Sequence, residues 1–341
     1  MNPTRRNILR GMAAAPALAL MGQVRLASAA KELKISHQFP GGTLTEGDFR
    51  DRLCRRFAAE LEKRSGGAVK GTVYPGSSLM KVNAQFSALR KGALDMSLVP
   101  LSYAGGEVPE TNIGLMPGVV TSYEKGAAWK TNEIGKALTD ILADKGVLVV
   151  SWIWQAGGAA SRGKALVEPE DAKGMKVRGG SREMDMVLKE AGAAVLSLPS
   201  NEIYAAMQTG ALDAAMTSST SLISFRLEEV AKNLTTGRGK TYWFMFEPLL
   251  VSRSVFESLP KDQQQLIMTI GAEMEKFGLE QAKVDDAAVA DVYTKAGGKA
   301  HDLSDATVKK WQAIARNTAW KDYAGKNANC ARIMGLVEKS L

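Results

Sequence analysis

Hydrophobic and polar residues alternate along this chain with two different periods. Short apolar runs bounded by proline and glycine predict β-strands over residues 33–39, 69–74 and 94–99. Between the first two strands, large apolar side chains recur every four residues and predict an amphipathic helix: Phe49, Leu53, Phe57 and Leu61. Gly66-Gly67 is placed to end it, and a second helix is expected over 82–91. Strands that alternate with helices are typical of the α/β class.

The same alternation returns in the middle of the chain. We expect strands over 176–178 and 195–198, each followed by a helix, the second over 200–208. Ser181 is placed to cap the first of these helices and Gly210 to end the second. Arg178 then stands near the end of one strand, and Pro199 at the end of the next. In open α/β sheets, ligands bind outside such strand ends.

An internal echo links these two regions. Residues 86–95 and 204–213 each end a helix with glycine and continue through Ala-Leu-Asp into a strand. Coincidence in a chain rich in glycine and alanine is one explanation. The other is two lobes of like design that face one another, with the loops at the strand ends framing a cleft, and we adopt it.

Glycine and proline positions, together with apolar runs, predict the secondary structure of the remaining segments. We expect a loop over 105–120, a helix over 123–145 and a buried strand over 147–154 that ends at Gly157-Gly158, a candidate hinge. A second crossing between lobes is expected near 240–246. Residues 262–295 predict one helix of unusual length, the alternative being two helices broken near Gly278. Further helices are expected from Ser304 and over 331–339.

The central region resembles the DctP-type solute-binding proteins of tripartite ATP-independent periplasmic (TRAP) transporters. That family carries Gly-x-Lys-x-Arg followed by Pro-x-x-Glu-x-Tyr-x-Ala-x-Gln-x-Gly, read here as Gly174 to Arg178 and Pro199 to Gly210, with Met207 where the family often has leucine. The resemblance implies a two-lobe periplasmic binding protein (type II-like), with a cleft between the lobes and a long helix spanning both. We divide the chain into lobe I, residues 31–158 plus 243–283, and lobe II, residues 159–242 plus 284–341.

The resemblance also implies a ligand site. In the family the arginine of the first motif clamps the carboxylate of the solute, which would be Arg178, and Arg162 matches a second arginine that often assists. Thr217 stands where the family often has an asparagine that touches the ligand. A guanidinium suits this task, because its paired N–H donors match the two oxygens of a carboxylate.

Aromatic residues near the two lobe crossings are further candidates. Tyr242 and Trp243 fall on a segment that borders the pocket in the resembled family, and Trp154 lies at the other crossing. Core packing is the alternative explanation for all three. Gln38 and Phe39 after the first strand, and Tyr103 after the third, could reach the ligand from the facing lobe.

Residues 1–30 read as an export signal of the twin-arginine type. Arg5-Arg6 precedes an apolar run and the small-residue cleavage site Ala27-Ser28-Ala29. The alternatives are a basic N-terminal tail or a membrane anchor, but the apolar run is too short to span a bilayer. The segment holds four of the 44 basic residues and no acid, so its removal leaves 40 basic against 36 acidic side chains. This small, scattered excess does not call for nucleic acid.

Catalytic and metal-binding patterns are missing from the sequence. His37 and His301 are the only histidines, and no phosphate-binding or nucleophile-elbow motif is present, so we expect no metal, no cofactor and no enzyme. Cys54 and Cys330 could pair in an oxidising compartment, but the apolar setting of Cys54 favours a buried free thiol.

We therefore expect a periplasmic, monomeric receptor that passes a small organic carboxylate to the membrane components of a TRAP transporter. The alternatives are a receptor of an ATP-driven importer or an exported hydrolase.

Overall fold

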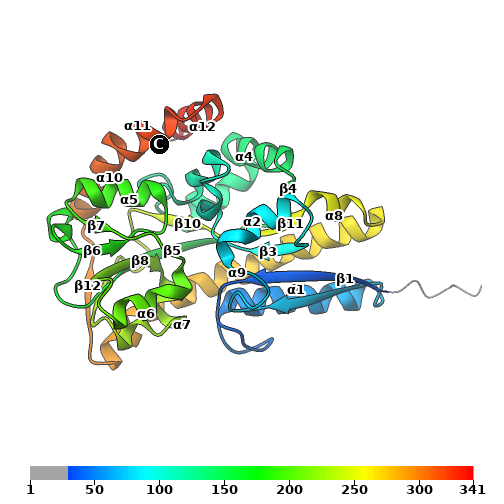
Figure 1. Cartoon of the computed structure of the whole chain (residues 1–341), viewed down its shortest axis with the longest axis horizontal. Helices are drawn as coiled ribbons and strands as arrows, with labels where there is room; N and C mark the ends of the chain where they lie inside the picture. Colours follow the sequence, from blue (N-terminus) through cyan, green and yellow to red (C-terminus); the bar gives the residue numbers. More distant parts are fainter. Residues whose placement is uncertain (1–29, 341) are drawn as a thin grey trace, which may run out of the picture.

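The computed structural model describes residues 30–340 and contains two β-sheets, each flanked by helices (Figure 1). The first sheet has the strand order β2 (Val69–Tyr74), β1 (Lys31–His37), β3 (Met96–Leu98), β11 (Leu249–Ser252) and β4 (Val147–Ser151). The second runs β12 (Lys299–Asp302), β9 (Asn233–Thr236), β5 (Trp154–Ser161), β8 (Ala214–Ser218), β6 (Lys176–Arg178) and β7 (Ala194–Val195), with β10 (Phe244–Phe246) paired to β5. We call the part built on the first sheet lobe I and the part built on the second lobe II.

The two sheets share one layout, as the internal echo predicts. In each, three parallel strands (β2-β1-β3 and β7-β6-β8) are followed by an antiparallel strand, β11 or β5. The aspartate that ends each copy of the echo makes the same kind of contact, with the backbone amide of a lysine. Asp95 Oδ2 accepts from the Lys34 amide, and Asp213 Oδ2 accepts from the Lys176 amide, both at 2.8 Å. The echo therefore reflects two lobes of like design.

Helices cover both sheets at positions close to those expected. In lobe I these are α1 (Phe49–Arg64), α2 (Val82–Arg90), α3 (Tyr123–Ala128), α4 (Glu133–Asp144) and α8 (Arg253–Glu257). In lobe II they are α5 (Arg182–Glu190), α6 (Ile203–Gln208) and α7 (Ser219–Ser224), while α10 (Asp305–Asn317), α11 (Ala319–Ala324) and α12 (Ala328–Lys339) close the chain. Ser181 Oγ accepts from the Met184 amide at 3.0 Å, which confirms the predicted cap of α5.

One helix, α9 (Lys261–Lys295), spans both lobes. It is continuous over 35 residues and packs against α1 and β4 of lobe I and against α7 and β5 of lobe II (Figure 1). The alternative of a break near Gly278 is thereby excluded. That glycine serves close packing instead, because a Cβ there would lie 2.6 Å from the Ile153 side chain.

The predicted strand end at Gly157-Gly158 is wrong. The apolar run splits into β4 and β5, and Gly157 and Gly158 pair with Ser218 and Thr217 in the middle of the second sheet. Glycine is needed at 157 for contact, since a Cβ would lie 2.0 Å from the Trp243 ring. The chain crosses between sheets at residues 152–153 and 247–248, so β5 and β10 both belong to lobe II. The sheets thus place the two crossings a few residues away from the boundaries at 158 and 243.

Three smaller differences have local causes. The helix expected over 123–145 is interrupted, because the Asn132 side chain caps a new helix by accepting from the Ile134 and Gly135 amides. The loop expected over 105–120 contains a buried 3₁₀ helix, η2 (Pro109–Leu115). Helix α11 is too short for its apolar period to be recognised from sequence.

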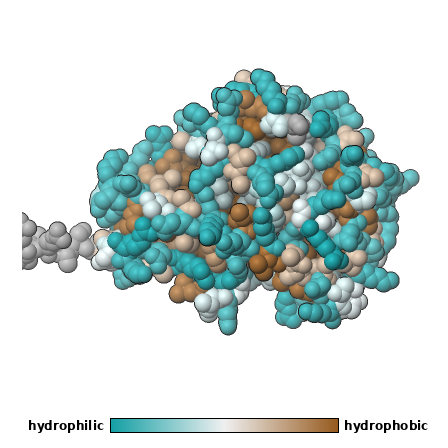
Figure 2. All heavy atoms as spheres, turned by 180° about the vertical axis from the view of Figure 1, so that it is seen from behind, coloured by the Kyte–Doolittle hydropathy of each residue, from teal (hydrophilic) through white to brown (hydrophobic). Residues whose placement is uncertain are grey.

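Cys54 and Cys330 are both buried and unpaired, which confirms the free-thiol prediction. Seen from behind, hydrophilic side chains cover most of the molecule and hydrophobic ones are dispersed among them (Figure 2). Within residues 30–340, no helix has the length and apolar character needed to cross a membrane. The predicted signal of residues 1–30 lies, except for its last residue, outside the described part.

Candidate functional site

Arg178 ends β6 and reaches the seam between the lobes. Its Nε donates to the Leu198 carbonyl at 3.0 Å, its Nη1 to the Met216 carbonyl at 2.7 Å and its Nη2 to the Tyr103 hydroxyl at 2.7 Å. Leu198 and Met216 belong to lobe II, whereas Tyr103 lies on η1 (Leu101–Ala104) of lobe I. The guanidinium is therefore held rigidly where the two lobes meet.

The charge of Arg178 is buried without an acidic partner. The residue is only 3% exposed, and no carboxylate of the described chain lies within 4.0 Å of its nitrogens. Of its five N–H groups, three are in use, which leaves one free donor on each terminal nitrogen. Burying a cation without a direct ion-pair partner is costly, so this arrangement favours binding of an anion.

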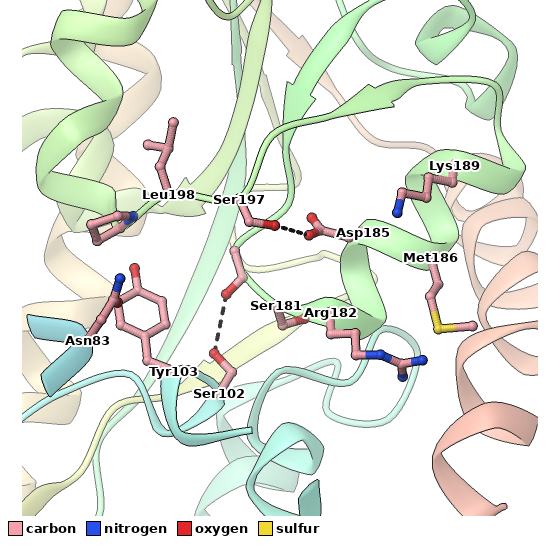
Figure 3. Close-up of a pocket in the computed structure, with 12 residues that line it drawn as sticks. Asn83, Ser102, Tyr103, Ser181, Arg182, Asp185, Met186, Lys189, Ser197 and Leu198 are labelled. Carbon is pink, nitrogen blue, oxygen red and sulfur yellow. Dashed lines mark hydrogen bonds between the residues drawn. The ribbon is translucent and has the colours of Figure 1, made fainter. Parts of the chain in front are cut away.

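A pocket of about 420 Å³ lies between the lobes and is lined by residues of both (Figure 3). Lobe I contributes Asn83, Ser102 and Tyr103, and lobe II contributes residues of two segments, 180–189 and 197–199. We call it the cleft pocket. Its wall borders Arg178 directly, because a Cβ on Gly180 would lie 2.6 Å from Nη1. Glycine at this position, with φ of 92°, leaves room for the guanidinium.

The charged side chains around the cleft pocket differ in whether they form ion pairs or hydrogen bonds with the protein. Arg182 points toward the C-terminal helices, where it pairs with Asp322 of α11 (Figure 3). Burial raises the pKa of Asp185, although its hydrogen bond from Ser197 and the charge of Arg178 oppose the rise. Lys189 is exposed on the pocket rim and forms no ion pair with any residue of 30–340. The pocket thus offers more positive than negative charge to a solute.

Other predicted site residues lie deeper in the seam. Gln38 and Thr217 are about 1% exposed, and neither their side-chain polar atoms nor Trp243 Nε1 have a hydrogen-bond partner among the described residues. Thr217 follows Met216, whose carbonyl binds Arg178. Phe39 is covered by the Arg50 guanidinium at 3.6 Å from its ring centre. Buried polar groups without partners are rare in native proteins, so these atoms are available to a ligand or to water.

A buried ionic cluster crosses the same seam and was not predicted from sequence. Arg50 donates to both oxygens of Asp48, to Glu247 Oε2 at 3.1 Å and to Ser218 Oγ of lobe II at 3.3 Å. Burial opposes ionisation of Asp48, but Arg50 outweighs it and holds the pKa of Asp48 below its usual value. Burial raises the pKa of Glu247 despite Arg50. Nothing in the spacing of these three residues signals their meeting.

The structure separates three predicted residues from the cleft pocket. Arg162 is exposed just beyond the end of β5, beside Gly210, and does not line the cleft pocket. Trp154 packs against Trp129 and Phe246 in the core. Tyr242 stacks on Trp311 at 5.1 Å. Core packing, the alternative left open for the aromatics, describes Trp154 and Tyr242.

Metal-binding geometry is also lacking in the described part. No group of three or more histidine, cysteine, aspartate or glutamate side chains within residues 30–340 could hold a metal ion. His37 instead bonds Asp51 at 3.1 Å inside lobe I.

Comparison with known families agrees with this geometry. The family model DctP, bacterial extracellular solute-binding protein, family 7, matches residues 42–326. The chain belongs to this family. It is 68% identical to a solute-binding protein of Albidiferax ferrireducens over 337 residues, 99% of each chain. It is also 25% identical to the C4-dicarboxylate-binding periplasmic protein DctP of Rhodobacter capsulatus, over 91% of each chain.

A solved structure extends the agreement to three dimensions. A TRAP periplasmic solute-binding protein from Rhodoferax ferrireducens with bound malonate superposes on this chain with a TM-score of 0.89 and 72% identity, covering 90% of this chain and 97% of that one. These findings favour a TRAP-type receptor over the two alternatives, a receptor of an ATP-driven importer and a hydrolase. They confirm both the two-lobe fold and the family resemblance of the central motifs.

Proposed function

We propose that this protein binds a small organic carboxylate on Arg178, in the cleft between the lobes, and delivers it to the membrane components of a TRAP transporter. The buried guanidinium carries the proposal, because it has no acidic partner in the described chain and keeps two donors unused beside a pocket. Bound to a carboxylate, these donors would form a charge-assisted pair.

The pocket indicates the size and charge of the solute. A volume of about 420 Å³ is at the small end of ligand sites. The 72% identical protein holds malonate, and the Rhodobacter relative is named for C4-dicarboxylates. Lys189 on the rim would face a second carboxylate. We therefore propose short dicarboxylates as solutes, with malonate and succinate as the first to test.

Substitution of Arg178 tests the proposal. Arg178→Ala should abolish measurable binding of malonate, since loss of one partner of a buried charge pair costs about 3–5 kcal/mol, or two to four decades in affinity. Arg178→Lys keeps the charge but removes the planar fork, and we expect it to lose at least about tenfold. Calorimetry measures both, with Arg162→Lys as the matched control that should bind normally. Near-native affinity of Arg178→Ala would sink the assignment.

Delivery requires export, for which we propose the twin-arginine route. The proposal is supported by Arg5-Arg6 and the cleavage motif in the sequence, and by membership in an extracellular family. Replacing both arginines by lysine should leave the protein in the cytoplasm, as measured by cell fractionation. An unchanged periplasmic yield would contradict this route.

A further inference from the structure

The Tyr103 hydroxyl joins the two lobes at the point where Arg178 is buried. Its oxygen accepts two hydrogen bonds, one from Arg178 Nη2 at 2.7 Å and one from the Ser200 amide at 3.0 Å. Tyr103 belongs to lobe I, and both donors belong to lobe II. The neighbouring Ser102 hydroxyl makes a second bond across the cleft, to the Gly180 carbonyl at 3.3 Å (Figure 3). Helix η1 is thus docked onto lobe II by hydroxyl groups.

The proton of this hydroxyl is left without an acceptor. A phenol oxygen that accepts two hydrogen bonds still has one O–H to donate. Within residues 30–340 no atom accepts from it, yet Tyr103 lines the cleft pocket. Hydrogen bonds in a chain polarise one another, so the bonds from the guanidinium and the amide make this O–H a stronger donor.

We propose that Tyr103 donates its O–H to the same solute carboxylate that Arg178 holds, so that recognition of the negative charge and closure of the lobes are one event. This inference rests on the proposed function and assigns lobe I its part in it. An ionised carboxylate accepts from both residues, because it has about four lone-pair sites. A carboxamide would place its own N–H groups opposite these donors, where no hydrogen bond can form. The site therefore selects the ionised acid, and it does so only when η1 has docked.

The matched pair Tyr103→Phe and Tyr204→Phe tests the inference. Tyr204 lies on α6, and its hydroxyl bonds Glu229 at the surface, so both changes remove one phenol oxygen. With malonate as the probe, Tyr103→Phe should weaken binding roughly ten- to hundredfold, the loss expected for a hydrogen bond to a charged group. Tyr204→Phe should stay within about twofold. Affinity of Tyr103→Phe within twofold of wild type, while Arg178→Lys fails, would overturn this inference and leave the proposed function standing.

A double-substitution cycle separates shared recognition from loss of fold. If both residues hold one carboxylate, Tyr103→Phe combined with Arg178→Lys should cost much less than the product of the two single effects. Multiplicative losses would contradict the shared contact. If instead Arg178→Lys alone binds malonate as wild type does, it is the proposed function that falls.

Hydrogen exchange at saturating malonate, where the lobes are closed, tests the lobe contact itself. In the wild type, the Ser200 amide is bonded to the phenol oxygen. Hydrogen exchange at Ser200 should therefore be faster in Tyr103→Phe than in wild type and unchanged in Tyr204→Phe. Equal protection of Ser200 in all three malonate-saturated proteins would refute the contact from Tyr103.

Discussion

Glu183 is buried in the first turn of α5, two residues after Ser181 in the wall of the cleft pocket. Burial raises its pKa to about 7, although its own backbone amide and Arg182 oppose the rise. The folded state therefore keeps this proton at pH values where the unfolded chain, with a value near 4.5, has lost it. Between these two values the unfolded state binds fewer protons, so stability falls as the pH rises.

Glu183→Gln should remove this loss. An amide cannot ionise, so the free energy of unfolding of the variant relative to wild type should increase from pH 5 to pH 8, by at most about 3 kcal/mol. Urea unfolding at the two pH values measures the difference. Glu190→Gln on the exposed end of the same helix is the control and should follow wild type. A variant that gains nothing at pH 8 would show that Glu183 ionises normally.

The role of a single residue was predictable where a sequence motif or a position next to a strand end indicates it. Arg178 follows from the family motif and the end of a strand, and Tyr103 from its place after the third strand; the structure brings the two together. Arg162 was expected to assist because it matches a second arginine of the family, but the structure places it exposed beyond the end of β5, beside Gly210. Arg50 and Glu247 are 197 positions apart in sequence, and only the packing of the lobes makes them neighbours.

Secondary structure elements were predictable to the extent that their signals are local. The start of α5 follows from the Ser181 cap, and the length of α9 from the small number of breakers in residues 262–295. The division of residues 147–161 into β4 and β5 could not be predicted, because an apolar run has the same pattern whether it belongs to one sheet or to two. Gly157 illustrates the ambiguity. A glycine in the sequence can mark either a hinge or a position of close packing. Here Gly157 allows close packing against Trp243.

The two lobes are joined by three kinds of connection. Covalent crossings lie at residues 152–153 and 247–248, and the unbroken helix α9 packs on both lobes. Across the cleft, most of the hydrogen bonds are made by hydroxyl and guanidinium groups. Tyr103 and Ser102 bond lobe II at one place, and Arg50 bonds Ser218 at another. Such bonds can be exchanged for bonds to water, and each contributes about 1–3 kcal/mol. The crossings and α9 are therefore permanent, whereas the cleft contacts can open.

We therefore expect the solute to change the overall dimensions of the protein. Opening by rotation at the two short crossings must be accommodated by α9, which packs on both lobes, while a carboxylate bound between Arg178 and Tyr103 would favour the closed state. Small-angle scattering of the mature protein should give a smaller radius of gyration with saturating malonate than without it, approaching the value of about 20 Å for a compact chain of this length. Arg178→Lys at the same malonate concentration should keep the larger radius. An unchanged radius in the wild type, with binding saturated in calorimetry, would mean that the lobes stay closed and that the solute enters by local movement of η1 alone.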